Sequence, residues 1–163
     1  MSKTINFAVK FEEEIVRQLE TLKQTDSEEI TSILDAVIKA EEKIIEVLKD
    51  AQKLDISLDT YKQIGIDKIL DKDNAFVDFM KNKDADFLKI FCELTAISAL
   101  IDRSAQFYSQ SAANNSNPTL KLFLSSLAQV KNVLRGRLKG CIRSVSNDIW
   151  QEVGFAPFAL GKD

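Results

Sequence analysis

Apolar residues recur along the chain at alternating steps of four and three, the spacing of one buried stripe on an amphipathic α-helix. The clearest stripe lies in the second half of the sequence, and its one charged member is Lys131. A second stripe with the same steps is interrupted by Glu41. Both patterns predict long helices that pack lengthwise against others. The two stripes consist of Leu120, Leu124, Leu127, Lys131, Leu134, Leu138, Cys141 and Val145, and of Ile30, Leu34, Val37, Glu41, Ile44, Leu48 and Ala51.

These stripes and the breaks between them predict a single all-α domain over residues 1–163. The polar run that ends at Pro118 is the clearest break, with Asn117 as a helix cap. We expect the last long helix to be disturbed near Gly136 and Gly140. The four long helices are expected at residues 7–23, 27–53, 85–112 and 118–146.

Two stretches outside the long helices have their own patterns. Residues 54–84 contain turn signals between short helical patterns, and they are long enough to carry the chain from one end of a bundle to the other. Residues 147–154 are expected to form a short helix. The tail at residues 155–163 is apolar, and we expect it to pack either on its own bundle or against a second subunit.

The composition excludes several classes of chemistry. The sequence has no histidine, which removes serine–histidine and cysteine–histidine nucleophiles and histidine-ligated metal sites. Cys92 and Cys141 do not make a disulfide framework, and we expect both to be small core residues. No apolar run is long enough to span a bilayer and no signal-peptide core is present, so we expect a cytoplasmic protein without membrane association.

Charge is distributed unevenly along the chain. Residues 1–102 carry 22 acidic and 14 basic residues, whereas residues 103–147 carry seven basic residues and no acidic one. This asymmetry makes a candidate surface for an anionic partner. Because no aromatic residues alternate with these bases, pairing with acidic helices of the same chain or of a second subunit is favoured over nucleic-acid binding. The candidate surface consists of Arg135, Arg137, Lys139 and Arg143.

An offset of ninety residues superimposes the two main stripes. Glu41 maps onto Lys131, so the charged interruptions coincide as well as the apolar positions. The same offset maps Glu12, in the stripe of the first helix, onto Asp102. We therefore expect an internal repeat of two antiparallel helical hairpins joined by a long crossover.

Short segments in all four helices resemble the rubrerythrin-type, ferritin-like family. Residues 99–108 resemble its first helix, in which a metal-binding acid is followed by an aromatic pair. Residues 127–134, and Glu41 with the three residues that follow it, resemble the partner helix with its Glu-x-x-His motif. The resemblance implies an antiparallel four-helix bundle whose carboxylates and histidines hold two iron or manganese ions. It implies carboxylate ligands at Glu12, Glu41, Asp102 and Lys131, and histidine ligands at Ile44 and Leu134.

This chain departs from that ligand set at three positions. Both histidine positions are aliphatic and one carboxylate position, Lys131, is a cation, so we expect no metal and no cofactor. Our hypothesis is that the Lys131 ammonium takes the place of the metal among Glu12, Glu41 and Asp102, with one carboxyl protonated or solvated. The alternative is that Lys131 extends to solvent from the edge of the stripe and that Glu41 lies at a solvated rim.

These expectations favour a non-catalytic function. The leading interpretation is a structural or partner-binding protein that forms a homodimer. The second is a divergent metal-dependent oxidoreductase or iron-binding protein that recruits unusual ligands. A third would use Lys131 as an amine of depressed pKa beside Tyr108.

Overall fold

The structure is a computed structural model that describes residues 3–53, 64–70, 75–79 and 86–154. Within these ranges every regular element is a helix, which confirms the all-α prediction. No helix in this part of the chain is both long enough and apolar enough to cross a bilayer. The elements are α1 (Lys3–Thr25), η1 (Glu28–Ile30), α2 (Thr31–Lys53), α3 (Ile66–Ile69), α4 (Ala75–Phe79), α5 (Phe87–Ala113) and α6 (Pro118–Glu152).

The beginnings of α5 and α6 are capped by side chains. The Asp86 carboxylate accepts a hydrogen bond from the Lys89 backbone N–H at 3.2 Å. The Asn117 side chain accepts from the backbone N–H groups of Thr119 and Leu120, at 3.0 and 3.1 Å. Such caps satisfy donors that the first helical turn leaves free. The predicted cap at Asn117 is therefore present.

Two helices are longer than the sequence pattern predicts. α1 begins at Lys3 rather than at residue 7, because Ile5 is buried and extends its apolar stripe toward the N-terminus. α6 is continuous through Gly136 and Gly140 and includes residues 147–152, so the predicted disturbance and the separate short helix are wrong. Partly buried Ile149 continues the α6 stripe beyond residue 146. The tail at residues 155–163 lies outside the described residues.

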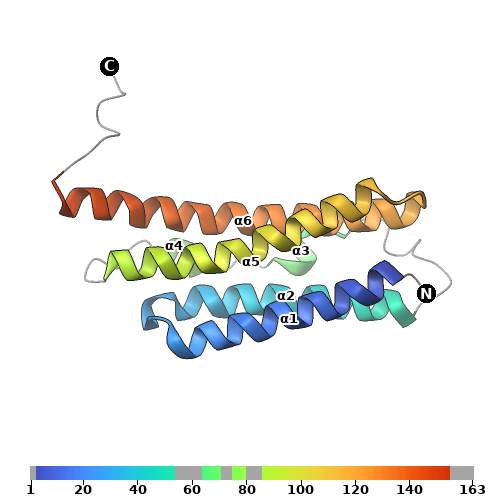
Figure 1. The fold of residues 1–163 in the computed structure, drawn as a ribbon, viewed down its shortest axis with the longest axis horizontal. Helices are drawn as coiled ribbons and strands as arrows, with labels where there is room; N and C mark the ends of the chain where they lie inside the picture. The colour runs from blue at the N-terminus through green and yellow to red at the C-terminus, as the bar shows by residue number, and fades with distance from the viewer. Residues whose placement is uncertain (1–2, 54–63, 71–74, 80–85, 155–163) are drawn as a thin grey trace, which may run out of the picture.

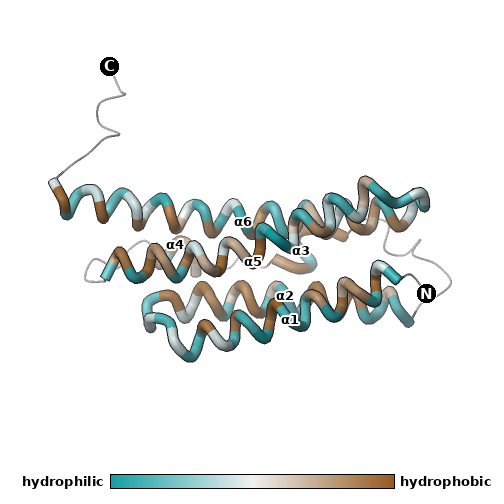
Figure 2. Tube along the Cα trace, viewed as in Figure 1, coloured by the Kyte–Doolittle hydropathy of each residue, from teal (hydrophilic) through white to brown (hydrophobic). Residues whose placement is uncertain are grey.

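Figure 1 shows the four long helices lying along a common direction. α5 packs against α6 and α1 against α2, while a smaller contact joins α1 to α5. The short helices α3 and α4 both contact α2 and α6, so part of the segment that connects α2 to α5 bridges these two helices. Along each long helix in Figure 2, hydrophobic and hydrophilic positions alternate, as expected for helices with one buried stripe.

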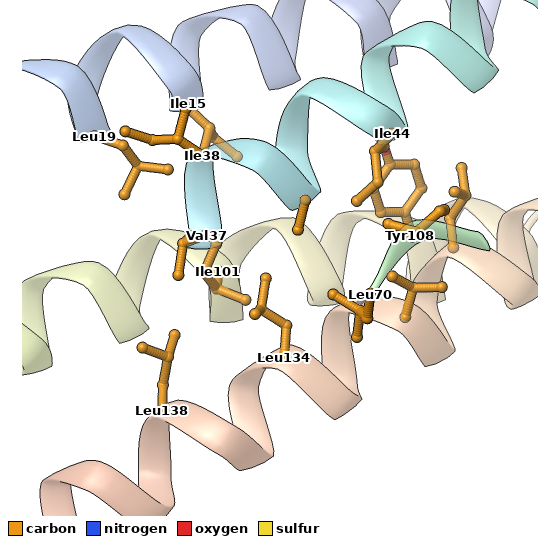
Figure 3. Close-up of a cluster of buried hydrophobic side chains, with 14 of the residues drawn as sticks. Ile15, Leu19, Val37, Ile38, Ile44, Leu70, Ile101, Tyr108, Leu134 and Leu138 are labelled. Carbon is orange, nitrogen blue, oxygen red and sulfur yellow. The ribbon is translucent and has the colours of Figure 1, made fainter. Parts of the chain in front are cut away.

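The predicted stripes form the core. Every member of the stripes that contain Glu41 and Lys131 is buried. Figure 3 shows side chains from α1, α2, α5 and α6 meeting in one interior, with Leu70 joining them from the segment that follows α3. The charged positions within these stripes are therefore held inside an apolar core.

Candidate buried charge cluster

Three ionisable side chains from three helices meet inside the core. Lys131 of α6, Glu12 of α1 and Glu41 of α2 are each 0% exposed. The Lys131 ammonium donates to Glu12 Oε2 at 2.9 Å and also donates to Glu41 Oε2. We refer to Lys131, Glu12 and Glu41 as the charge cluster. A buried charge is costly unless it is paired and hydrogen-bonded, and here one cation pairs with carboxylates from two other helices.

Ser104 of α5 completes the surroundings of Glu12. Its hydroxyl is buried and donates to Glu12 Oε1 at 3.0 Å, so both oxygens of this carboxylate are hydrogen-bonded. The sequence analysis did not single out Ser104. The burial of Ser104 could nevertheless have been predicted from the sequence. It lies on one stripe of α5 that follows the same alternating steps of four and three, through Ile97, Ile101, Ser104 and Tyr108.

Asp102 does not belong to the charge cluster, and the expectation that it faces Lys131 is wrong. Its side chain is 37% exposed and forms an ion pair with Arg135 of α6. Gln106 also donates to Asp102, at 3.0 Å. Asp102 lies outside the buried stripe of α5, and Arg135, one turn after Lys131, offers it a partner near solvent.

The charges of the cluster shift the pKa values of its members. Burial raises the pKa of Glu12, but the charge of Lys131, the hydrogen bond from Lys131 and the neighbouring Glu41 and Tyr108 side chains outweigh it, so the net shift is downward. Burial and the neighbouring Glu12 charge hold the pKa of Glu41 well above its usual range, despite the opposing effect of Lys131. The two carboxyls are coupled, so Glu12 gives up its proton first and Glu41 retains its proton to higher pH.

Lys131 remains a cation in this arrangement. Burial alone lowers its pKa, but the charge of Glu12, that of Glu41 once this carboxyl ionises, and the hydrogen bonds to both raise it above its ordinary value. The suggestion of an amine with a depressed pKa is therefore wrong. While Glu41 keeps its proton, one ammonium, one carboxylate and one neutral carboxyl leave the charge cluster without net charge.

Two polar atoms beside the cluster lack a hydrogen-bond partner among the described residues. They are Glu41 Oε1 and the Tyr108 hydroxyl, and both are buried. Burial and the nearby charge of Glu12 raise the pKa of Tyr108 well above its ordinary value, so the phenol stays protonated. The Tyr108 ring packs edge-on against Phe107, with ring centroids 5.1 Å apart.

The residues present do not fit a two-metal centre. Ile44 and Leu134, at the two histidine positions that the resemblance implies, are buried apolar residues. The Glu12 carboxylate is already bound to an ammonium and a hydroxyl, and Asp102 pairs elsewhere. No group of three or more candidate metal ligands occurs among the described residues. The donor set is that of a lysine–carboxylate network rather than a metal site.

The candidate basic surface is not one continuous patch of unpaired bases. Arg135 pairs with Asp102, and the Arg137 guanidinium lies 6.0 Å from the centre of the Phe76 ring in α4. Lys139 and Arg143 are exposed. At least one of the four bases therefore pairs with an acid of the same chain.

The two cysteines are free and differ in their surroundings. Cys92 is exposed, which corrects the expectation that it is a core residue. Cys141 is buried, its thiol donates to the Phe76 carbonyl at 3.5 Å, and burial raises its pKa to about 11. The two thiols are not joined to each other.

Comparisons with known proteins do not add an identity to this geometry. The chain matches no protein-family model, no curated protein and no solved structure.

Proposed function

We propose that this chain is a ferritin-like four-helix bundle in which the Lys131 ammonium replaces a two-metal centre, and that it acts without metal as a structural or partner-binding protein. The order of the helices supports this proposal. In Figure 1 the colours of α1 and α2 run in opposite directions along the molecule, and those of α5 and α6 do so too. α2 and α5 run the same way, as a long crossover between two hairpins requires.

The observation that carries the proposal is the complete burial of the Lys131 ammonium between carboxylates of α1 and α2. A metal ion in the centre of a bundle joins helices by binding carboxylates from several of them. Lys131 makes the same kind of connection among three helices with hydrogen bonds and charge. Since its charge is matched within the cluster, this connection needs no added cation.

The surroundings of the cluster support a non-catalytic role. Its three side chains are fully buried, so a substrate has no access to them in this conformation. A hollow of about 520 Å³ lies between α2 and α4 and is lined by Asp35, Lys39 and Phe79 among others, not by the cluster. A catalytic acid, base or nucleophile must reach the atoms on which it acts.

Homodimer formation is part of the proposal and concerns the surface rather than the cluster. Large apolar side chains are exposed at Phe7, Leu88 and Val153, from three different helix ends. Light scattering at several protein concentrations tests this part separately, and a mass that stays at that of one chain would contradict it.

The test of the metal-free proposal is elemental analysis of protein purified without chelators and then incubated with Fe²⁺ or Mn²⁺. We expect no stoichiometric metal in the natural protein, because Glu12 is already bound to an ammonium and a hydroxyl. The Lys131→Glu variant adds a carboxylate beside Glu12 and Glu41 and should gain metal binding. Lys139→Glu makes the same charge change at an exposed position of α6 and should not. One iron or manganese ion per natural chain would overturn the proposal.

A further inference from the structure

Three phenylalanine rings form a cluster at the surface where α1 and α5 meet. The ring centroid of Phe107 in α5 lies 5.2 Å from those of both Phe7 and Phe11 in α1. The centroids of Phe7 and Phe11 are 5.9 Å apart. Phe11 and Phe107 are half-buried, whereas Phe7 is 55% exposed. We refer to these three rings as the aromatic patch. An exposed apolar cluster of this kind marks a surface from which a partner can exclude water.

The aromatic patch is bordered by positive charge. On α1, Lys3 and Lys10 stand one helical turn to either side of Phe7. On α5, Arg103 stands one turn before Phe107. Residues one turn apart are neighbours on a helix surface, so these three exposed bases flank the rings. None of the three forms an ion pair within the part of the chain that the structure describes.

The nearest acids of the same two helices do not neutralise these bases, because each is engaged with another group. The acids and their partners are Glu12 with Lys131 in the charge cluster, Glu13 with Lys49 at 2.7 Å, Glu14 with Arg17 at 2.6 Å, and Asp102 with Arg135. The aromatic patch is therefore apolar at its centre and positive at its rim, although the whole chain has a net charge of −3. Such a surface fits a partner that is both apolar and negatively charged.

The end of α6 has this complementary character. Residues 144–154 contain two acidic residues, Asp148 and Glu152, and no basic one. Val153, directly after the helix, is 64% exposed, and Trp150 in the last turn is 38% exposed. In Figure 1 this end of α6 projects beyond the other three long helices. An acidic and apolar segment is therefore displayed away from the body of the bundle.

The two complementary surfaces lie too far apart to meet within one chain. Figure 1 shows that α1 begins and α5 ends at one end of the molecule, whereas α6 ends at the other. α6 has 35 residues, so its two ends are about 50 Å apart. Two copies that lie side by side in opposite directions would bring each α6 end to the aromatic patch of the other copy. A two-fold arrangement of this kind forms both contacts at once and closes on itself.

We propose that the aromatic patch of one chain binds the end of α6 of a second copy, so that an antiparallel homodimer forms through two equivalent contacts. This inference rests on the homodimer part of the proposed function and names its interface. In each contact the apolar side chains at the α6 end cover the three rings, and the bases at the rim face the two acids. Two aromatic patches facing each other would instead bring like charges together.

A charge exchange tests this pairing. The variant Lys10→Glu/Arg103→Glu makes the rim of the patch acidic, and the variant Asp148→Lys/Glu152→Lys makes the α6 end basic. Each variant sets like charges against each other in its own homodimer, so we expect its dimer dissociation constant to rise by at least about tenfold. An equimolar mixture of the two variants places opposite charges at both contacts. The mixture should therefore dimerise about as tightly as the natural protein.

The readout is sedimentation equilibrium of the full chain, with far-UV circular dichroism to show that each variant is folded. Lys139→Glu/Arg143→Glu is the matched control, because it reverses two exposed bases of α6 outside the patch. This control should keep the dissociation constant of the natural protein. Recovery of the dimer in the mixture supports the interface even if both variants are less stable as monomers.

Two results would overturn the proposal in distinguishable ways. A natural dimer whose two variants dissociate no more than the control, or whose mixed variants fail to recover, would overturn this interface and leave the homodimer intact. A natural protein that stays monomeric would overturn both the interface and the homodimer. In that case, binding to phosphatidylserine vesicles that is lost in Lys10→Glu/Arg103→Glu would assign the patch to an anionic membrane instead. None of these outcomes depends on metal content.

Discussion

Replacing Lys131 by methionine removes the cation that bridges Glu12 and Glu41 and leaves the apolar part of the side chain in place. All three side chains are fully buried, so water cannot substitute for the lost ammonium without opening the core. The ionised Glu12 keeps only its hydrogen bond from Ser104 and its contact with Glu41. Removing one partner of a buried ion pair costs about 3–5 kcal/mol. For a chain of this size, that loss lowers the melting temperature by roughly 6–20 °C.

The destabilisation should also depend on pH. In the natural protein the pKa of Glu12 is lowered, so the stability it contributes is present at neutral pH and lost as the pH falls through the lowered value. In Lys131→Met the cation that lowers this pKa is gone, and protonated Glu12 no longer carries an unpaired charge. The difference in stability between the two proteins should therefore be largest near pH 7 and shrink in acid.

The assay is urea unfolding followed by far-UV circular dichroism at several pH values. Lys139→Met is the control, since Lys139 is exposed on the same helix and its loss should change the free energy of unfolding by less than about 0.5 kcal/mol. The double variant Lys131→Met/Glu12→Gln removes both charges and should recover about 1–3 kcal/mol of the loss. A Lys131→Met protein as stable as the control at pH 7 would refute the buried ion pair.

Three further predictions concern Tyr108, Gly136 and the thiols. Tyr108→Phe removes a buried hydroxyl that has no hydrogen-bond partner among the described residues. The free energy of unfolding should therefore not fall and should rise by up to about 1 kcal/mol. A fall of more than about 1.5 kcal/mol would instead indicate a hydrogen bond from Tyr108 to Glu12. Gly136→Ala should stabilise the protein by about 0.5–1 kcal/mol, because a Cβ there meets no atom within 4 Å and alanine favours the helix; an unchanged urea midpoint would contradict this. A disulfide reagent should label Cys92 rapidly and Cys141 only as fast as the protein unfolds, and equal rates would show that Cys141 is accessible.

The helices and the core were predictable from the sequence because the buried stripes repeat at helical spacing. Lys131 and Glu41 occupy stripe positions, and this was enough to place both side chains in the interior. The position of Asp102 was predicted wrongly because the ninety-residue offset was applied to α5, whose own buried stripe passes through Ser104. The spacing of apolar residues along α5 itself therefore predicts which of its residues are buried better than the ninety-residue offset between the two halves of the chain does.

Contacts between distant segments were less accessible to sequence reasoning. Glu93 binds Ser27 across 66 residues, and neither residue belongs to a motif that would pair them. Sharing of a proton between Glu12 and Glu41 also depends on a distance between helices, which periodicity does not supply. The sequence could predict that one carboxyl would need a proton, because the acids outnumbered the lysine, but not that Glu41 would hold it.

The most direct test of the central claim is the charge state of the Lys131 side chain, measured by ¹⁵N NMR of the natural protein from pH 6 to pH 11.5. The account predicts an ammonium whose protons exchange slowly and that stays charged beyond 10.5, the ordinary lysine value, because Glu12 and Glu41 raise its pKa. Lys139, which is exposed, serves as the internal reference. A neutral amine near pH 7, or an ammonium that titrates below the surface lysines, would contradict the claim that this cation takes the place of a metal.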